Sequence, residues 1–208
     1  GGRPLLEWVL CRLAHAATID KIILATSDSK NDNVLVDLAI KHKVEVYRGS
    51  ETDVLSRFVG AANLYNADNV VRICADNPFV DPYEVDRLVD FFSERQFDYA
   101  CNHQNRLGSG YADGFGAEIF TVDVLKKIED IAKEQRYREH ATLYIWDHAS
   151  EYKLTSLVAP EYLAFPQLRF DVDTQDDLFA LEVLVKAGVH IHSTAQDIIS
   201  IAQEKNDF

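Results

Sequence analysis

Val70-Val71-Arg72-Ile73-Cys74-Ala75-Asp76-Asn77-Pro78-Phe79-Val80-Asp81 is the stretch that decides the fold. Its first half is a short apolar run rich in β-branched residues, which is typical of a strand buried on both faces. Asp76 stands where that run ends, and Pro78 holds Asn77 extended so that the chain turns there. Open α/β sheets bind ligands beyond the carboxyl ends of their strands, so we expect Asp76 to project into a ligand site. An ordinary turn acid is the alternative interpretation.

A second acidic strand end occurs far along the chain, at Phe170-Asp171-Val172-Asp173-Thr174. The alternation of side chains along a strand puts Asp171 and Asp173 on one face. Mg²⁺ is usually held by one or two protein carboxylates together with substrate phosphate oxygens. The two strand ends therefore predict a magnesium site formed by Asp76, Asp171 and Asp173.

Hydrophobic periodicity predicts an α/β chain whose elements alternate along most of its length. Expected helices cover about 4–17, 32–42, 54–62, 82–92, 124–128, 137–148, 175–186 and 195–204, and expected strands cover about 21–26, 44–47, 70–75, 97–101, 117–121, 152–158 and 167–172. Three strand-helix units in succession imply a parallel sheet. We also expect Asp81, Asp176 and Asp177 to cap helices, and the polar segment 102–113 to be a functional flap.

Composition limits the kinds of protein that this chain can be. It has 208 residues, 47% hydrophobic and 26% charged, which fits a single domain spanning 1–208. The net charge of −13 argues against a broad surface for nucleic acid or an anionic membrane. Three cysteines, two of them in apolar runs, favour reduced thiols and a cytoplasmic location. No apolar run is long enough to span a membrane.

Several common site patterns do not occur in the sequence. There is no HxxxH or Cys/His zinc spacing, no GxSxG nucleophile elbow, and no GxGxxG or GxxxxGK[ST] loop. Two arginines are better candidates for a site. Arg48 follows a strand end and could meet a ligand anion, while Arg72 lies inside the apolar run and should reach a carboxylate or a bound anion.

A collinear set of motifs extends along nearly the whole chain and resembles the cytidylyltransferase family, most closely its SpsF-like group of spore-coat polysaccharide biosynthesis. The motifs are Gly2-x-Pro4-Leu5-Leu6, Ala25-Thr26-Ser27-Asp28, Arg48-Gly49-Ser50-Glu51-x-Asp53-Val54-Leu55-x-Arg57, Arg72-x-x-x-Asp76-Asn77-Pro78, Asp113-Gly114-x-Gly116-x-Glu118, Arg138-Glu139-His140 and Val172-Asp173-Thr174-x-x-Asp177-Leu178. Relatives of this group include the synthetases of CMP-3-deoxy-octulosonate and CMP-sialic acids.

This resemblance implies a fold and a reaction. The fold is the three-layer nucleotide-diphospho-sugar transferase (GT-A-like) fold, with a central mixed, mostly parallel sheet flanked by helices. The reaction joins CTP and an acceptor sugar, which we expect to be acidic, into CMP-sugar and pyrophosphate. The family's first strand and its triphosphate-binding loop would precede Gly1, so we expect the natural chain to have further residues upstream.

The resemblance also implies roles for individual residues. Asp76 and Asp173 match the magnesium carboxylates, with Asp171 as an additional acid. The other matched positions are Arg48, Ser50 and Asp28 for the nucleotide, Arg72, Asn77, Glu118 and Glu139 for the substrate, and Arg138 and His140 for catalysis. Arg138 would bind an anionic group while His140 or Glu139 orients the attacking hydroxyl, although local ion pairing near a helix start is an alternative role for the cluster.

Two other functions stay open at this point. A GT-A glycosyltransferase also uses paired acids and a metal to bind a nucleotide sugar, and a non-catalytic protein could bind a nucleotide without turning it over. Pyrophosphate release from CTP and an acceptor would distinguish the cytidylyltransferase from both. The expected partners are CTP and a sugar, with a homodimer left open.

Overall fold

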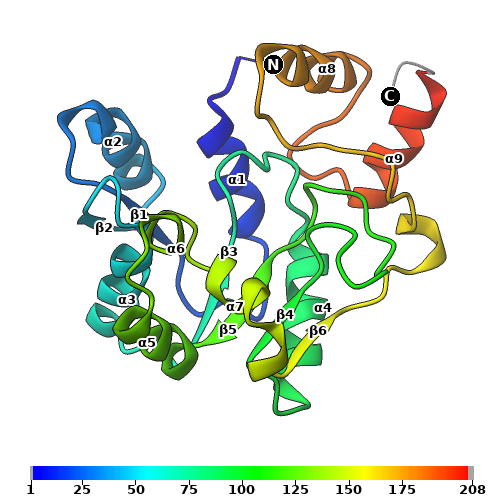
Figure 1. Ribbon diagram of the computed structural model, residues 1–208. Coiled ribbons are helices and arrows are strands. Elements are labelled where there is room, and N and C mark those ends of the chain that lie inside the picture. The colour runs from blue at the N-terminus through cyan, green and yellow to red at the C-terminus, as the bar shows by residue number, and fades with distance from the viewer. Residues whose placement is uncertain (1, 206–208) are drawn as a thin grey trace.

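The computed structural model describes residues 2–205 (Figure 1). The α-helices are α1 (Leu5–Leu13), α2 (Asn33–Lys41), α3 (Val54–Leu64), α4 (Pro82–Ser93), α5 (Val122–Ile131), α6 (Gln135–Glu139), α7 (Leu143–Asp147), α8 (Gln175–Lys186) and α9 (Ala195–Glu204). The strands are β1 (Ile23–Ser27), β2 (Glu45–Gly49), β3 (Asn69–Arg72), β4 (Tyr99–Cys101), β5 (Glu118–Thr121) and β6 (Leu154–Ser156). Short 3₁₀ turns are η1 (Lys30–Asp32), η2 (Ala149–Glu151) and η3 (Glu161–Leu163).

The strands form two sheets, and their pairing is mixed. β1 and β2 are parallel, as the first two strand-helix units predict. The third strand, β3, does not extend that pair in the described structure but lies antiparallel to β5, in a sheet of order β3-β5-β4-β6. The register sets Arg72 opposite Glu118, and these side chains form an ion pair. The expectation that β3 extends a parallel sheet was therefore wrong. Local periodicity cannot show that β3 pairs with β5, because the two strands are far apart in the sequence.

Two predicted elements are interrupted in the structure. The helix expected over 137–148 is divided into α6 and α7, because the backbone leaves helical geometry at His140, with φ −111° and ψ 86°. Thr142, between the two helices, donates its hydroxyl hydrogen bond to the buried Glu118. The strand expected over 167–172 is extended chain that forms a single parallel bridge, Asp113 to Arg169. Each departure brings residues toward β5 and the loop before it.

The helices cover the sheets and close one end of the molecule. α3 contacts β1 and β2 and also packs on α5 and α6, whereas α4 contacts β4 and β5. α8 lies above α1 (Figure 1), and α9 contacts α8. No helix within residues 2–205 has the length and the apolar character needed to cross a membrane.

A buried polar connection joins α1 to the start of α4 and to α9. Arg12 is 1% exposed and donates from Nε to the Val80 carbonyl oxygen at 2.6 Å and from Nη1 to the Ile191 carbonyl oxygen at 2.9 Å. Asp81 caps α4, as predicted, by accepting from the Tyr83 amide at 2.9 Å, and its other oxygen accepts from the Ala195 amide at 2.5 Å. Burial lowers the pKa of Arg12 to about 10, and Asp81 opposes that shift.

Candidate active site

A cleft of about 490 Å³ opens where β3 ends and the antiparallel β5 begins. Its lining comes from four parts of the chain: β3 with the turn after it, the 102–116 loop with β5, the α6–α7 segment, and the extended chain at 171. The residues are Arg72, Cys74, Asp76, Asn77, His103, Gln104, Arg106, Asp113, Glu118, His140, Thr142, Leu143, Trp146 and Asp171. The structure therefore brings together six predicted residues, namely Arg72, Asp76, Asn77, Glu118, His140 and Asp171.

Gly114 allows the 102–116 loop to approach the chain near residue 170. It has φ +104°, and a Cβ at this position would lie 2.9 Å from the Phe170 carbonyl carbon, so only glycine fits without a shift of the backbone. The Asp113 amide donates to the Leu168 carbonyl oxygen at 3.0 Å, and the Phe170 amide donates to the Asp113 carbonyl oxygen at 3.0 Å. This pairing sets Asp113 beside the chain that carries Asp171.

Asp76, Asp113 and Asp171 form what we call the acid wall of the cleft. The Asp76 backbone carbonyl accepts from the Val172 amide at 2.9 Å, which joins the two predicted strand ends. The side-chain Oδ1 of Asp76 is buried and has no hydrogen-bond partner among the described residues. Burial raises the pKa of Asp76, and the charges of Asp171 and Asp173 raise it further. Burial and then Asp171 raise the pKa of Asp113 to about 6.

Arg169 partly neutralises this side of the cleft. Its Nε donates to Asp171 Oδ1 at 3.0 Å, and its Nη2 donates to Asp173 Oδ2 at 2.9 Å. The Asp173 side chain is 62% exposed and is not part of the cleft lining. Asp173 therefore adds its charge to the wall from outside.

The acid wall fits a divalent cation that retains other ligands. It offers carboxylate oxygens, including the unpartnered Oδ1 of Asp76. No three acids of this wall bring ligand oxygens within 4.8 Å of one another. Mg²⁺ keeps several waters and substrate phosphate oxygens in its coordination sphere, so widely spaced carboxylates suit it better than a closed cage would.

Arg72 and Glu118 form what we call the ion-pair wall. Glu118 is 2% exposed and accepts from Arg72, from the Tyr99 hydroxyl, and from Thr142 Oγ1 at 3.0 Å. Burial acts to raise the pKa of Glu118, but Arg72, His103 and the hydrogen bond from Tyr99 together hold this pKa below its usual value. Arg72 thus reaches a carboxylate, as its place in an apolar strand predicts.

The 102–116 loop adds polar groups to the cleft. His103 is buried, and its burial lowers its pKa to about 4, so the ring is neutral near pH 7. Arg106 stacks on Trp146, with its guanidinium carbon 4.4 Å from the ring centroid. Arg72 and Arg106 therefore both present guanidinium groups to this cleft.

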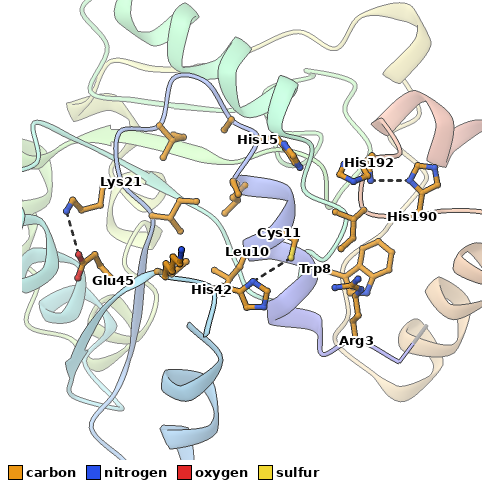
Figure 2. A pocket seen from close by; sticks show the side chains of 18 of the residues that line it. Arg3, Trp8, Leu10, Cys11, His15, Lys21, His42, Glu45, His190 and His192 are labelled. Atoms are coloured by element: carbon orange, nitrogen blue, oxygen red, sulfur yellow. Dashed lines mark hydrogen bonds and ion pairs between the residues drawn. The ribbon is translucent and has the colours of Figure 1, made fainter. Parts of the chain in front are cut away.

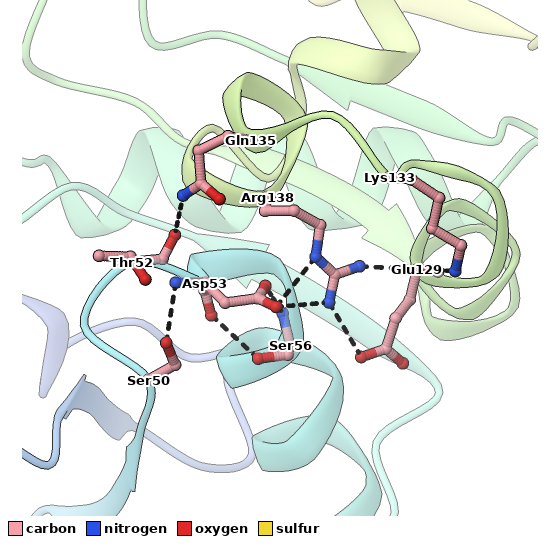
Figure 3. A network of polar contacts seen from close by, with 8 residues as sticks. All are labelled: Ser50, Thr52, Asp53, Ser56, Glu129, Lys133, Gln135 and Arg138. Atoms are coloured by element: carbon pink, nitrogen blue, oxygen red, sulfur yellow. Dashed lines mark hydrogen bonds and ion pairs between the residues drawn. The ribbon is translucent and has the colours of Figure 1, made fainter.

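Arg138 lies outside the cleft lining and holds the segment before α3 (Figure 3). Its Nε and Nη2 donate to Asp53 Oδ2 at 2.9 and 2.7 Å, and its Nη1 donates to the Glu129 carbonyl oxygen at 3.1 Å. Ser50 Oγ accepts from the Asp53 amide at 3.1 Å. These contacts give Arg138 and Ser50 a structural role at the junction of α3 and α6. A contact of either residue with a ligand stays a prediction.

The other predicted nucleotide residues lie at the carboxyl ends of β1 and β2. Arg48 donates to the Ser27 carbonyl oxygen at 2.9 Å and to the Ser29 carbonyl oxygen at 2.6 Å, and the Asp28 amide donates to the Gly49 carbonyl oxygen at 2.8 Å. Glu139 is exposed. None of these residues is part of the cleft lining.

Four further residues line the cleft without having been predicted as site residues, namely Asp113, His103, Arg106 and Thr142. Asp113 stands in the motif Asp113-Gly114-x-Gly116, whose glycines signal a close backbone approach. His103 and Arg106 lie in the loop that we expected to be functional, but loop residues carry no periodic signal that would show which of them face a site. Thr142 lies between α6 and α7, but the hydrophobic periodicity of this segment is continuous and does not show that the helix is interrupted there.

The chain is similar to known proteins in sequence and in structure. A profile of the cytidylyltransferase family matches residues 1–203. The chain is 39% identical over 177 residues to the uncharacterized protein MJ1063 of Methanocaldococcus jannaschii, covering 85% of this chain and 70% of that one. It is 33% identical over 213 residues to the spore coat polysaccharide biosynthesis protein SpsF of Bacillus subtilis, covering 100% and 86%. A solved cytidylyltransferase structure from Leptospira borgpetersenii superimposes with a TM-score of 0.91 at 26% identity, covering 99% and 85%.

Proposed function

We propose that this chain, which belongs to the cytidylyltransferase family and is a nucleotidyltransferase, transfers CMP from CTP to an acidic sugar and releases pyrophosphate. The name of the Bacillus subtilis relative supports a sugar destined for a surface polysaccharide. The three free cysteines suit a reducing compartment, so the proposed location is the cytoplasm.

The buried, unpartnered Oδ1 of Asp76 carries the proposal. An unpartnered buried carboxylate oxygen costs stability, which is a reason to expect a ligand for it. Asp76, with Asp171 and Asp173, would hold Mg²⁺, which neutralises charge on the triphosphate and on the leaving pyrophosphate. The raised pKa values of Asp76 and Asp113 follow from burial and from neighbouring acids, and a bound cation would remove much of that repulsion.

The ion-pair wall and Arg106 support an anionic acceptor. Arg72 is held in place by Glu118, so it meets a ligand without losing side-chain freedom. Arg106 is placed by its stacking on Trp146. His140 also lines the cleft and is exposed, so its ring could accept the proton of the attacking hydroxyl. These groups would orient the sugar while its oxygen attacks the α-phosphate in line.

Pyrophosphate release tests the proposal. The full-length natural protein is incubated with each nucleoside triphosphate, with Mg²⁺, and with acidic sugars or their neutral analogues. We expect release only with CTP and an acidic sugar. Asp76→Asn should lower the rate at least about a hundredfold without unfolding the protein. Asp90→Asn, which changes an exposed acid on α4, is the matched control.

The same assay can reject the proposal. In a parallel incubation with a nucleotide sugar as the donor, sugar transfer without pyrophosphate release would indicate a glycosyltransferase. CTP binding without turnover for any sugar would indicate a binding protein. A wild-type rate in Asp76→Asn would remove the metal assignment, and equal use of neutral sugars would remove the acidic acceptor.

A further inference from the structure

Three potential metal ligands meet where α1 contacts α2, away from the cleft. Glu7 and Cys11 are one turn apart on α1, and His42 is the residue that follows α2. Residues four apart lie on the same face of a helix, so both α1 side chains face the same neighbour. Figure 2 shows the Cys11 and His42 side chains pointing toward each other beside α1.

The three groups lie near enough to one another to reach a common ion after side-chain movement. Cys11 Sγ lies 3.8 Å from His42 Nδ1, and Glu7 Oε1 lies 3.6 Å from His42 Nε2. With one atom taken from each residue, the three ligand atoms all lie within 4.8 Å of one another. Zinc binds sulfur at about 2.3 Å and nitrogen or oxygen at about 2.0–2.2 Å, so neighbouring ligand atoms of a tetrahedral site are roughly 3.3–3.7 Å apart. The two short contacts end on different ring nitrogens of His42, so binding of one ion requires the imidazole to turn a single nitrogen toward both Cys11 and Glu7.

The present partners of these groups leave coordination capacity unused. His42 Nε2 is buried and has no hydrogen bond among the described residues, and the thiol contact of Nδ1 is long and weak. The Glu7 side chain is 11% exposed, and its Oε1 also accepts from Arg3 Nη1 at 2.9 Å. Arg3 is thus the cation with which a metal ion would compete. Cys11 and His42 also line a cavity of about 960 Å³, which gives an ion access.

The chemistry of the three groups selects the ion. Thiolate, imidazole and carboxylate together suit Zn²⁺, whereas Mg²⁺ and Ca²⁺ prefer oxygen ligands alone. Three protein ligands leave the fourth tetrahedral position to water. Within residues 2–205, no other group of three histidine, cysteine or acidic side chains meets the same distance limit.

We propose that Glu7, Cys11 and His42 bind one Zn²⁺ ion, which joins α1 to the C-terminal end of α2. The site uses no residue of the cleft, so it stands independently of the proposed transferase reaction. Its effect would be on stability, because an ion that binds only the folded chain stabilises that chain.

Cobalt titration of the chelator-treated, full-length natural protein tests this proposal. One Co²⁺ per chain should give the absorption of thiolate charge transfer, and Zn²⁺ should remove that absorption. Cys11→Ser should abolish that absorption, and His42→Gln should weaken binding at least about tenfold. The matched controls are Cys74→Ser, which changes another half-buried free cysteine, and His15→Gln, which changes an exposed histidine next to α1. Both controls should bind Co²⁺ like the wild type.

A second measurement needs no variant and so does not depend on whether Cys11→Ser folds. Zn²⁺ should slow alkylation of Cys11 at least about tenfold relative to Cys74 in the same wild-type sample, as measured by peptide mass mapping. Absence of a thiolate band, a band that disappears in Cys74→Ser, or equal alkylation rates with and without Zn²⁺ would overturn the proposal.

Discussion

Glu118 is 2% exposed and accepts hydrogen bonds from three side chains, whereas Asp76, in the same cleft, keeps a buried oxygen without one among the described residues. Burial acts to raise the pKa of Glu118, but Arg72 and its other partners hold that pKa below its usual value. Burial and neighbouring acids raise the pKa of Asp76. A carboxylate whose partners are all within the chain serves to position them. A carboxylate without partners weakens the fold and is available to a ligand.

The ion-pair wall should therefore give the largest loss of stability. Glu118→Gln removes the negative charge that compensates Arg72, and breaking a buried ion pair by removing one partner costs about 3–5 kcal/mol in the free energy of unfolding. Chemical denaturation near neutral pH measures this loss. Glu139→Gln, at an exposed position, should change stability by less than about 0.5 kcal/mol. A loss below about 1 kcal/mol for Glu118→Gln would contradict the structural role that we assign to the ion-pair wall.

A substitution in the acid wall should instead increase the free energy of unfolding, and this gain should depend on pH. The pKa of Asp113 is about 6 in the folded chain and 3.8 ordinarily, so the folded state holds this proton more tightly and stability falls as pH rises between these values. Asp113→Asn should then stabilise the protein above pH 6 by about 1 kcal/mol, after discounting for solvent screening, and by almost nothing near pH 4. Unfolding free energies of both proteins across this range measure the difference. A benefit that grows toward low pH would contradict the assignment.

Arg169 lies beside the acid wall, and its substitution should give the smallest change in the free energy of unfolding. Its side chain is 60% exposed, so Arg169→Gln should change the free energy of unfolding by no more than about 0.5 kcal/mol. The variant also frees Asp171 and Asp173, so half-maximal pyrophosphate release should need several-fold less Mg²⁺. Arg136→Gln, at another exposed, ion-paired arginine, is the control and should leave the Mg²⁺ requirement unchanged. An increased Mg²⁺ requirement in Arg169→Gln would mean that this arginine helps to bind substrate.

Local chemistry made part of this structure predictable from the sequence. Asp81 and Asp177 cap helices as expected, because a cap depends on residues within one turn. Arg72 was expected to find a carboxylate, since a charge in an apolar strand requires a partner. The two acidic strand ends predicted one site for Asp76, Asp171 and Asp173, and the cleft lining includes Asp76 and Asp171 but not Asp173.

Contacts between distant segments could not be predicted in this way. Glu118 belongs to β5, and only the register of β5 against β3 shows that it faces Arg72. Arg138 looked like an anion-binding residue, but whether it pairs with Asp53, 85 residues away, depends on how α3 packs against α6. Cys11 lies on α1 and His42 follows α2, 31 residues later in the chain, so no short sequence spacing indicates that they meet.

The buried hydrogen bonds of Arg12 and Asp81 have a consequence for the order of folding. Arg12 reaches a carbonyl 179 residues away, and Asp81 binds an amide 114 residues away. Contacts between such distant residues must first overcome the entropy of closing a long loop. We therefore expect α1, α4 and α9 to dock late, after the strand pairs that lie closer together in the sequence. Early intermediates would then expose the apolar face of α9.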